Sequence, residues 1–117
     1  MSITAAGEDS AARDVRTDLD VAAIQQDFRD NLACIMARFR AIAGVNDLYQ
    51  ALAYTVRDRL LARWVSSAQH FRDTAARTVC YLSAEFLIGP QLGANMLNLG
   101  IRDAVEAAMA GLDIDLE

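Results

Sequence analysis

The chain is 117 residues long, with 54% hydrophobic and 23% charged residues, which suits one globular unit and is too short for two ordinary domains. Its net charge of −5 disfavours a nucleic-acid partner, and all eleven basic residues are arginines, so no lysine can form a Schiff base. One histidine and two cysteines are too few for most metal sites. No secretory signal or membrane span is evident, so we expect a cytoplasmic protein without a membrane partner.

Residues 1–18 are small, polar and acidic, and we expect a disordered tail before a globular region at 19–117. Apolar residues then recur every three or four positions, which predicts one face of a long helix. These residues are Val21, Ile24, Phe28, Leu32, Ile35, Phe39 and Ile42. Asp18 or Asp20 can cap its start and Gly44 can end it, while charged residues such as Asp27 lie mostly off the apolar face.

A second helix is predicted from a cap at Asn46 or Asp47 to about His70. It has two apolar stripes on different sides and should therefore pack against two partners. The first stripe is Leu48, Leu52, Val56, Leu60 and Trp64, and the second is Tyr54, Leu61, Val65 and Ala68. The charged group Arg57, Asp58, Arg59 and Arg63 is interpreted as a solvated or interface ion-pair cluster, with an anion site as the less favoured alternative. We place His70 at the helix end or surface.

The continuous apolar run Thr78–Leu87 predicts a strand buried on both faces, as in a parallel sheet. A short helix follows from Pro90 to Leu99 with Gly100 as its stop, and another covers residues 102–110 and ends at Gly111. One strand makes no sheet. Either the run is something else or its partner strands lie in sequence not given, and we favour the latter. Cys34 and Cys80 are expected to be reduced and buried.

Few residues carry a chemical signal by themselves. Glu85 lies near the carboxyl end of the predicted strand, where open α/β folds bind ligands, although a solvent-facing or arginine-paired glutamate is the simpler interpretation. The turn at residues 89–93 has two glycines before a helix, but its spacing matches no phosphate-binding motif. Ser83 lacks the surroundings of a nucleophile elbow. From these residues alone we predict a mostly helical piece of an α/β protein.

Two longer motifs carry a resemblance. The sequence YLSAEFLIG at residues 81–89, followed by NMLNLG at 95–100, resembles the YLSxEF(L/Y)xGR and NxxxNL signature of the α-glucan phosphorylases, which act on glycogen, starch or maltodextrin. Upstream, YQALA at 49–53, VRDRL at 56–60 and RW at 63–64 resemble a helix of the same family. Order and spacing match, and the resemblance extends roughly from Val21 to Leu116.

The resemblance implies a parent enzyme in which phosphate cleaves terminal α-1,4 bonds of a glucan and releases glucose 1-phosphate. It implies pyridoxal phosphate on a lysine, two large α/β domains with the active site between them, and usually a homodimer. This chain is similar to the N-terminal part of the first domain. We therefore expect a mostly helical fragment with two long helices, one buried strand and two short helices.

The resemblance transfers few site residues. Glu85 matches a glutamate that borders the catalytic cleft, and Leu87 matches a position near the cofactor, whereas no catalytic, cofactor-holding or metal-binding residue is expected in the chain itself. The glycine-rich loop of the family would follow Glu117. Pro90 replaces the family's arginine, and Ala84 replaces a larger residue. Near the end of the second helix, the side chains at 68 and 72 do not match the nucleotide-binding pattern of animal relatives.

Three hypotheses follow. The chain is an N-terminal phosphorylase fragment that is inactive alone, with α-glucan and phosphate as substrates of the parent enzyme. Alternatively, it is a stand-alone helical interaction protein that forms a homodimer or binds a full-length phosphorylase subunit. The third possibility is a pseudogene product that does not fold.

Overall fold

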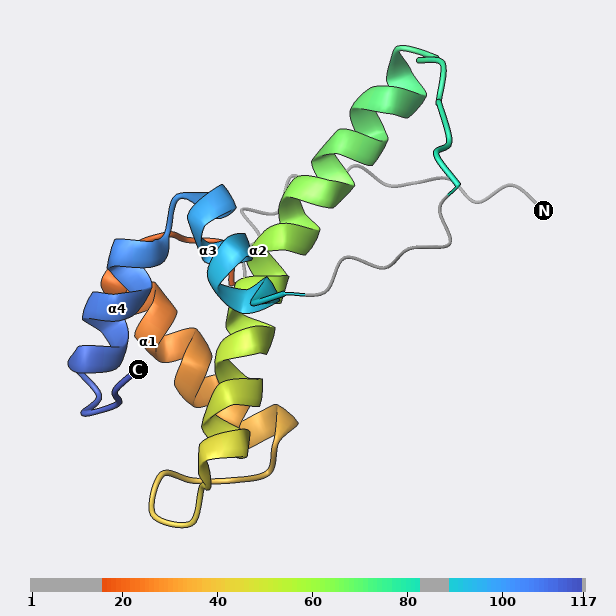
Figure 1. The fold of residues 1–117 in the computed structure, drawn as a ribbon. Coiled ribbons are helices and arrows are strands. Elements are labelled where there is room, and N and C mark those ends of the chain that lie inside the picture. Colours follow the sequence, from red (N-terminus) through yellow and green to blue (C-terminus); the bar gives the residue numbers. More distant parts are fainter. Residues whose placement is uncertain (1–15, 83–88, 117) are drawn as a thin grey trace, which may run out of the picture.

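The computed structural model describes residues 16–82 and 89–116. They form four α-helices and one π-helical turn: α1 (Val21–Asp30), η1 (Asn31–Ile35), α2 (Val45–Asp73), α3 (Gln91–Leu99) and α4 (Arg102–Ala110) (Figure 1). No strand occurs within these two described ranges. The prediction of a mostly α-helical chain with two short C-terminal helices is confirmed.

Helix α1 begins where the sequence predicts, because the Asp20 carboxylate accepts a hydrogen bond from the Ala23 N–H at 3.0 Å. The helix is much shorter than predicted, however. The backbone widens into η1 at Asn31, and Ala37 has a φ of 50° that ends the helical path. Because the chain turns here, Phe39 is 63% exposed instead of continuing the apolar face.

Helix α2 contains 29 residues and is about 43 Å long at 1.5 Å per residue. Gly44 starts this helix rather than ending the previous one, since its N–H donates to the Asp47 carboxylate at 3.0 Å. The predicted N-cap at Asn46 or Asp47 is therefore wrong: Gly44 is the N-cap, and Asp47 is the third residue of α2, whose carboxylate accepts the N–H of that cap. The helix continues three residues beyond His70, and the Thr74 N–H bonds the His70 carbonyl at 3.0 Å.

Helices α3 and α4 have the predicted bounds within one residue. Gly100 adopts the left-handed conformation with φ 70°. Its N–H donates to the backbone carbonyl of Leu97, in the last turn of α3, at 3.0 Å. Glycine accepts this conformation without the steric cost of a Cβ atom, so it is a suitable helix stop. Gly111 follows the last residue of α4, also as predicted.

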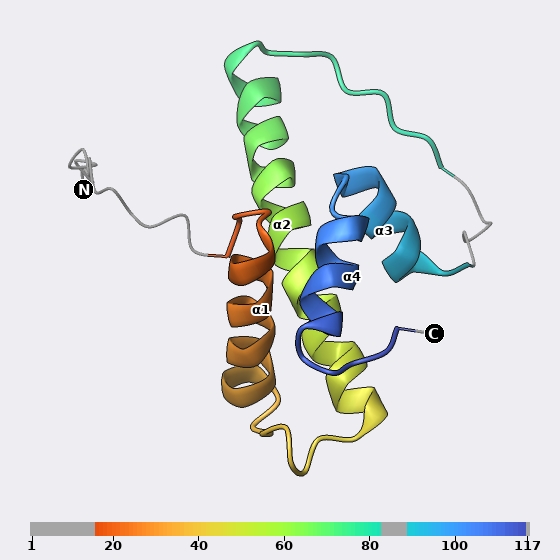
Figure 2. The same cartoon turned by 90° about the vertical axis from the view of Figure 1, so that its left-hand side faces the viewer.

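The core lies where α1, the first half of α2, α3 and α4 meet, and Figures 1 and 2 show that the second half of α2 extends beyond this body. Helix α1 packs against both α2 and α4, and α3 packs against the same two helices. The buried apolar residues are Ile24, Phe28, Leu32, Ala51, Leu52, Val56, Met96, Leu99, Ile101, Val105, Ala108 and Met109.

The buried strand predicted over Thr78–Leu87 is wrong for the residues the structure describes. Residues 78–82 form no strand, and Tyr81 and Leu82 are 89% and 93% exposed. The physical reason is that the described residues supply no second strand to satisfy its backbone groups. Residues 83–87 lie outside the described part. Cys34 and Cys80 are free thiols, but both are exposed, so their predicted burial is also wrong.

Candidate functional site

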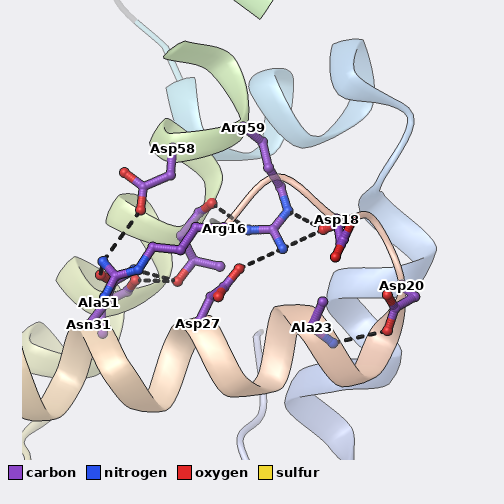
Figure 3. Close-up of polar contacts among 10 residues, drawn as sticks. Arg16, Asp18, Asp20, Ala23, Asp27, Asn31, Ala51, Asp58 and Arg59 are labelled. Carbon is purple, nitrogen blue, oxygen red and sulfur yellow. Dashed lines mark hydrogen bonds and ion pairs between the residues drawn. The ribbon is translucent and has the colours of Figure 1, made fainter. Parts of the chain in front are cut away.

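A buried arginine joins α2 to α1 and to the segment before α1 (Figure 3). Arg59 is only 2% exposed, although its side chain carries a full positive charge. Its Nη2 atom lies 2.9 Å from the Asp27 carboxylate of α1, and its Nη1 atom donates to the Thr55 carbonyl at 2.9 Å. Its Nε atom donates to the Asp18 carbonyl, also at 2.9 Å. The guanidinium thus donates hydrogen bonds to groups on three chain segments, namely α1, α2 and the segment before α1.

A second set of polar contacts continues beside this arginine. The Asn31 amide donates to Thr55 Oγ1 at 3.0 Å, and the Thr55 hydroxyl donates to the Ala51 carbonyl at 2.9 Å. Arg16 donates to Asn31 Oδ1 at 2.9 Å and lies 3.8 Å from the Asp58 carboxylate. In the part of the chain that the structure describes, no buried side-chain nitrogen or oxygen lacks a partner. The network therefore fixes how α1 crosses α2.

The sequence interpretation missed this network. Arg59 was grouped with the solvated or interface ion pairs, whereas it is buried, and Asp27 was placed off the apolar face, whereas it is 7% exposed. The position of Asp27 in the sequence indicates its burial, because Asp27 directly precedes Phe28 and lies three residues after Ile24 on the same side of the helix. An acid on an apolar face requires a buried partner, and such a partner is normally an arginine.

The second half of α2 and the following segment have few contacts with the body. We call residues 61–82 the arm; in Figure 1 its helical portion points away from α1 and α4. Trp64 is 67% exposed and Phe71 is 54% exposed. An apolar stripe runs along this portion at helical spacing, namely Leu61, Trp64, Val65, Ala68 and Phe71. Large exposed apolar patches are typical of interaction surfaces.

A second surface feature is a cavity of about 930 Å³, which we call the groove. Its floor is the buried core residues Phe28, Leu52, Met96 and Met109, and its walls are the start of α2, the start of α3, α4 and the C-terminal residues up to Leu116. Tyr49 on one wall is half exposed, so the groove is open to solvent.

Charged residues line the open side of the groove. Glu106, Asp113 and Asp115 contribute acidic groups, whereas Arg40 and Arg102 contribute guanidinium groups. The hydrogen bond from Arg102 Nε to Glu106, 2.7 Å long, raises the pKa of Arg102 above its ordinary value, and the charge of Glu106 adds to this shift. Arg102 therefore stays charged, and its charge is largely balanced by its own helix.

The predicted site residues are distributed unevenly over the structure. Ser83, Glu85 and Leu87 lie outside the described residues, so their positions are not given. His70 is exposed in the last turn of α2, which confirms a surface position. Arg63 donates to the Leu99 carbonyl at 3.0 Å and so ties the beginning of the arm to α3.

Two further observations concern metals and membranes. In the described ranges, 16–82 and 89–116, no group of three or more histidine, cysteine or acidic side chains could hold a metal ion. No helix found in those ranges has the length and apolar character needed to cross a bilayer. The described residues thus form a helical body whose buried polar side chains are all hydrogen-bonded, an arm with exposed apolar side chains, and an open groove.

Comparisons with known proteins show what the chain is similar to. The glycogen phosphorylase of Synechocystis sp. is 48% identical over 104 residues, which cover 87% of this chain and 12% of that protein. The human liver and brain forms of glycogen phosphorylase are 39% and 38% identical over 98 residues, covering 84% of this chain and 12% of each. No family model matches the chain.

These relatives agree with the motifs at residues 49–64 and 81–100, which resemble the α-glucan phosphorylases. The chain is homologous to a short N-terminal region of the glycogen phosphorylases. It spans about one eighth of the length of the relatives it matches.

Proposed function

We propose that this chain provides the N-terminal helical portion of an α-glucan phosphorylase and has no catalytic activity by itself. In this role the body is a folded support, and the arm contacts parts of the enzyme outside these 117 residues. The substrates of the parent enzyme are an α-glucan and phosphate, and the product is glucose 1-phosphate.

One observation carries the proposal: a 48% identical relative matches 87% of a chain whose second half of α2 remains uncovered. A stand-alone domain would normally bury large apolar side chains such as Trp64 and Phe71. Here the core is complete without them. The exposed stripe is therefore explained if additional phosphorylase sequence packs on it.

The cofactor implied by the resemblance does not fit these residues. Pyridoxal phosphate is held in the family through a lysine amine, and this chain contains eleven arginines but no lysine. Guanidinium groups do not form that imine, because they remain protonated. We therefore propose that the cofactor is held elsewhere in the parent enzyme, and we derive no step through it here.

Glu85 and Leu87 are proposed to border the catalytic cleft of the parent enzyme. Support for this assignment comes from the YLSAEFLIG motif alone. As lining residues they would shape the cleft without taking part in bond making. A cytoplasmic location is proposed as well, supported by the similarity of the chain to glycogen phosphorylases.

A graft tests the proposal. The 104-residue segment of the Synechocystis enzyme is replaced by the matching residues of this chain, and release of glucose 1-phosphate from glucan and phosphate is measured. We expect activity within about tenfold of the parent, equivalent to a barrier change below ~1.4 kcal/mol. The isolated chain should release none above the blank. A graft that folds and holds its cofactor but is inactive would contradict the proposal.

A second graft experiment addresses the cleft residues. Glu85→Gln in the active graft should lower turnover without lowering the melting temperature, because a lining carboxylate contacts the cleft rather than the core. Ser83→Ala, two positions away, is the matched control and should retain turnover. Equal activity of both variants would contradict the role of Glu85.

The exposed arm also favours the second candidate, a separate interaction protein that binds a full-length phosphorylase. This hypothesis predicts that the isolated chain binds the intact Synechocystis enzyme, in which the corresponding surface is already present. Immobilised chain and intact enzyme are compared with immobilised chain and an enzyme lacking its own 104-residue segment. Binding only to the shortened enzyme favours the first candidate, and binding to both favours the second.

A further inference from the structure

We propose that the peptide bond between Arg77 and Thr78 is a proteolytic modification site, cut by a serine protease that is specific for arginine. The cut divides the chain into residues 1–77 and 78–117, and the two pieces stay associated through the helical body. The proposal concerns the 117-residue chain itself and does not depend on phosphorylase activity.

The bond lies on a segment of the arm that a protease can reach. Residues 76–82 belong to neither a helix nor a strand, and all of them are exposed. Within residues 77–82, no backbone group forms a hydrogen bond with another described residue. Figures 1 and 2 show this segment as an irregular trace that runs clear of the helices. Exposed irregular segments are the preferred sites of proteolytic nicking, because they can enter an active site without unfolding the rest of the protein.

The Arg77 side chain is available for recognition. It forms no ion pair and no hydrogen bond with another described residue, whereas Arg72 lies 3.3 Å from the Asp73 carboxylate. An arginine-specific protease binds the guanidinium through a carboxylate in its specificity pocket. Two alanines precede Arg77 and a threonine follows it, so the bond is flanked by small side chains.

The other arginines of the described residues are held by helices or by hydrogen bonds. Arg38 and Arg40 lie between η1 and α2, where the Arg38 N–H donates to the Leu32 carbonyl at 2.9 Å and the Arg40 side chain donates to the Asp113 carbonyl at 3.3 Å. The side chain of Arg16 is held against η1 and α2. The arginines within helices are Arg29, Arg57, Arg59, Arg63, Arg72 and Arg102. Cleavage at such sites requires local opening first, so Arg77 is the preferred site.

The reaction is an ordinary hydrolysis with water as the second reactant. The bond between the Arg77 carbonyl carbon and the Thr78 nitrogen breaks, and the protease serine holds the acyl group until water replaces it. The oxygen of water stays on the carbon and its hydrogens neutralise the leaving nitrogen. The products are a carboxylate on Arg77 and an ammonium group on Thr78, and both new charges lie in the exposed arm.

The core keeps the two pieces together after the cut. Helices α1 and α2 belong to the first piece, and α3 and α4 belong to the second, while α1 packs against α4 and α2 packs against α3. The buried apolar cluster contains side chains from both pieces. Two hydrogen bonds of 3.0 Å also join them, from Gln25 to the Ala108 carbonyl and from Arg63 to the Leu99 carbonyl. Cleavage therefore yields a nicked, non-covalent complex.

Brief digestion of the purified chain with trypsin, followed by mass spectrometry, tests the site. Among the bonds within residues 16–116, the bond after Arg77 should be cut first. Arg77→Gln should slow the first cut in this range by about tenfold or more, because the remaining arginines there require local opening. Arg72→Gln is the matched control on the same arm and should be cut after Arg77 as fast as the unmodified chain. Far-UV circular dichroism verifies that both variants are folded.

The nicked chain provides the second measurement. After the trypsin is inhibited, both pieces should elute together in size-exclusion chromatography, with the circular dichroism at 222 nm nearly unchanged, and urea should separate them. A first cut elsewhere within residues 16–116, an unchanged rate for Arg77→Gln, or release of residues 78–117 from the nicked chain in buffer would each overturn the proposal.

Discussion

Replacing Arg59 with methionine should destabilise the body more than any other single change at a charged residue. The guanidinium is 2% exposed, and it bonds the Asp27 carboxylate and the carbonyls of Asp18 and Thr55. Methionine retains most of the apolar stem but supplies no donor. The substitution therefore isolates the polar contribution, because packing changes little.

The expected magnitude follows from the group that remains. Without Arg59, the Asp27 carboxylate is 7% exposed and has lost its cation. Breaking a buried ion pair by removing one partner costs about 3–5 kcal/mol. If Asp27→Leu is combined with Arg59→Met, no buried charge remains, and the loss should fall to about 1 kcal/mol for the unpaired carbonyl of Asp18.

Urea unfolding monitored by circular dichroism at 222 nm measures these differences, at a concentration where the chain is monomeric. Arg57→Met is the matched control, since Arg57 is exposed, pairs with Asp58 at 3.1 Å and stacks 4.7 Å from the Tyr54 ring. Its loss should be below about 1 kcal/mol. The reasoning is refuted if Arg59→Met costs no more than Arg57→Met, or if the double variant is as unstable as Arg59→Met alone.

Three smaller predictions concern helix ends and thiols. Asp20→Ala removes the cap of α1 and should cost about 1 kcal/mol in urea unfolding, whereas Asp18→Ala should cost little because only its carbonyl is used; equal losses would contradict the cap. Gly100→Ala forces a Cβ atom into a residue with φ 70° and should lower the free energy of unfolding by about 1–2 kcal/mol, and an unchanged value would argue against the left-handed turn. Cys34 and Cys80 are exposed free thiols, so a native-state thiol titration should detect both rapidly; slow reaction of either would contradict its exposure.

The sequence was most informative where one local interaction decides the structure. Asp20 marks a helix start through its side-chain cap and Gly100 marks a helix end through a left-handed turn, and these effects depend on neighbouring residues only. The buried apolar positions Ile24 and Phe28 of α1 and Leu32 of η1 were likewise identified by their spacing. The family motifs added the relationship to glycogen phosphorylases, which the comparisons confirm.

Prediction from the sequence failed where contacts between residues far apart in the chain determine the local structure. The periodicity through Phe39 and Ile42 suggested a longer first helix, but the buried Asn31 bonds Thr55 on α2 and the chain leaves the helix after η1. Pairing of Asp27 with Arg59 spans 32 residues and has no local signature. The candidate cleft residues lie outside the described part of the chain, and residues 78–82 before them find no strand partner among the described residues, so this part of the site could be assigned only by resemblance.

Amide hydrogen exchange tests the central claim most directly, because that claim is a self-supporting helical body followed by a segment whose partners lie elsewhere in a phosphorylase. The isolated chain is compared, at a concentration where it is monomeric, with the grafted enzyme. We predict strong protection at core residues such as Val56 and Val105 in both, and protection of residues 79–82 only in the graft. Protection of residues 79–82 in the isolated monomer, equal to that of the core, would contradict the account.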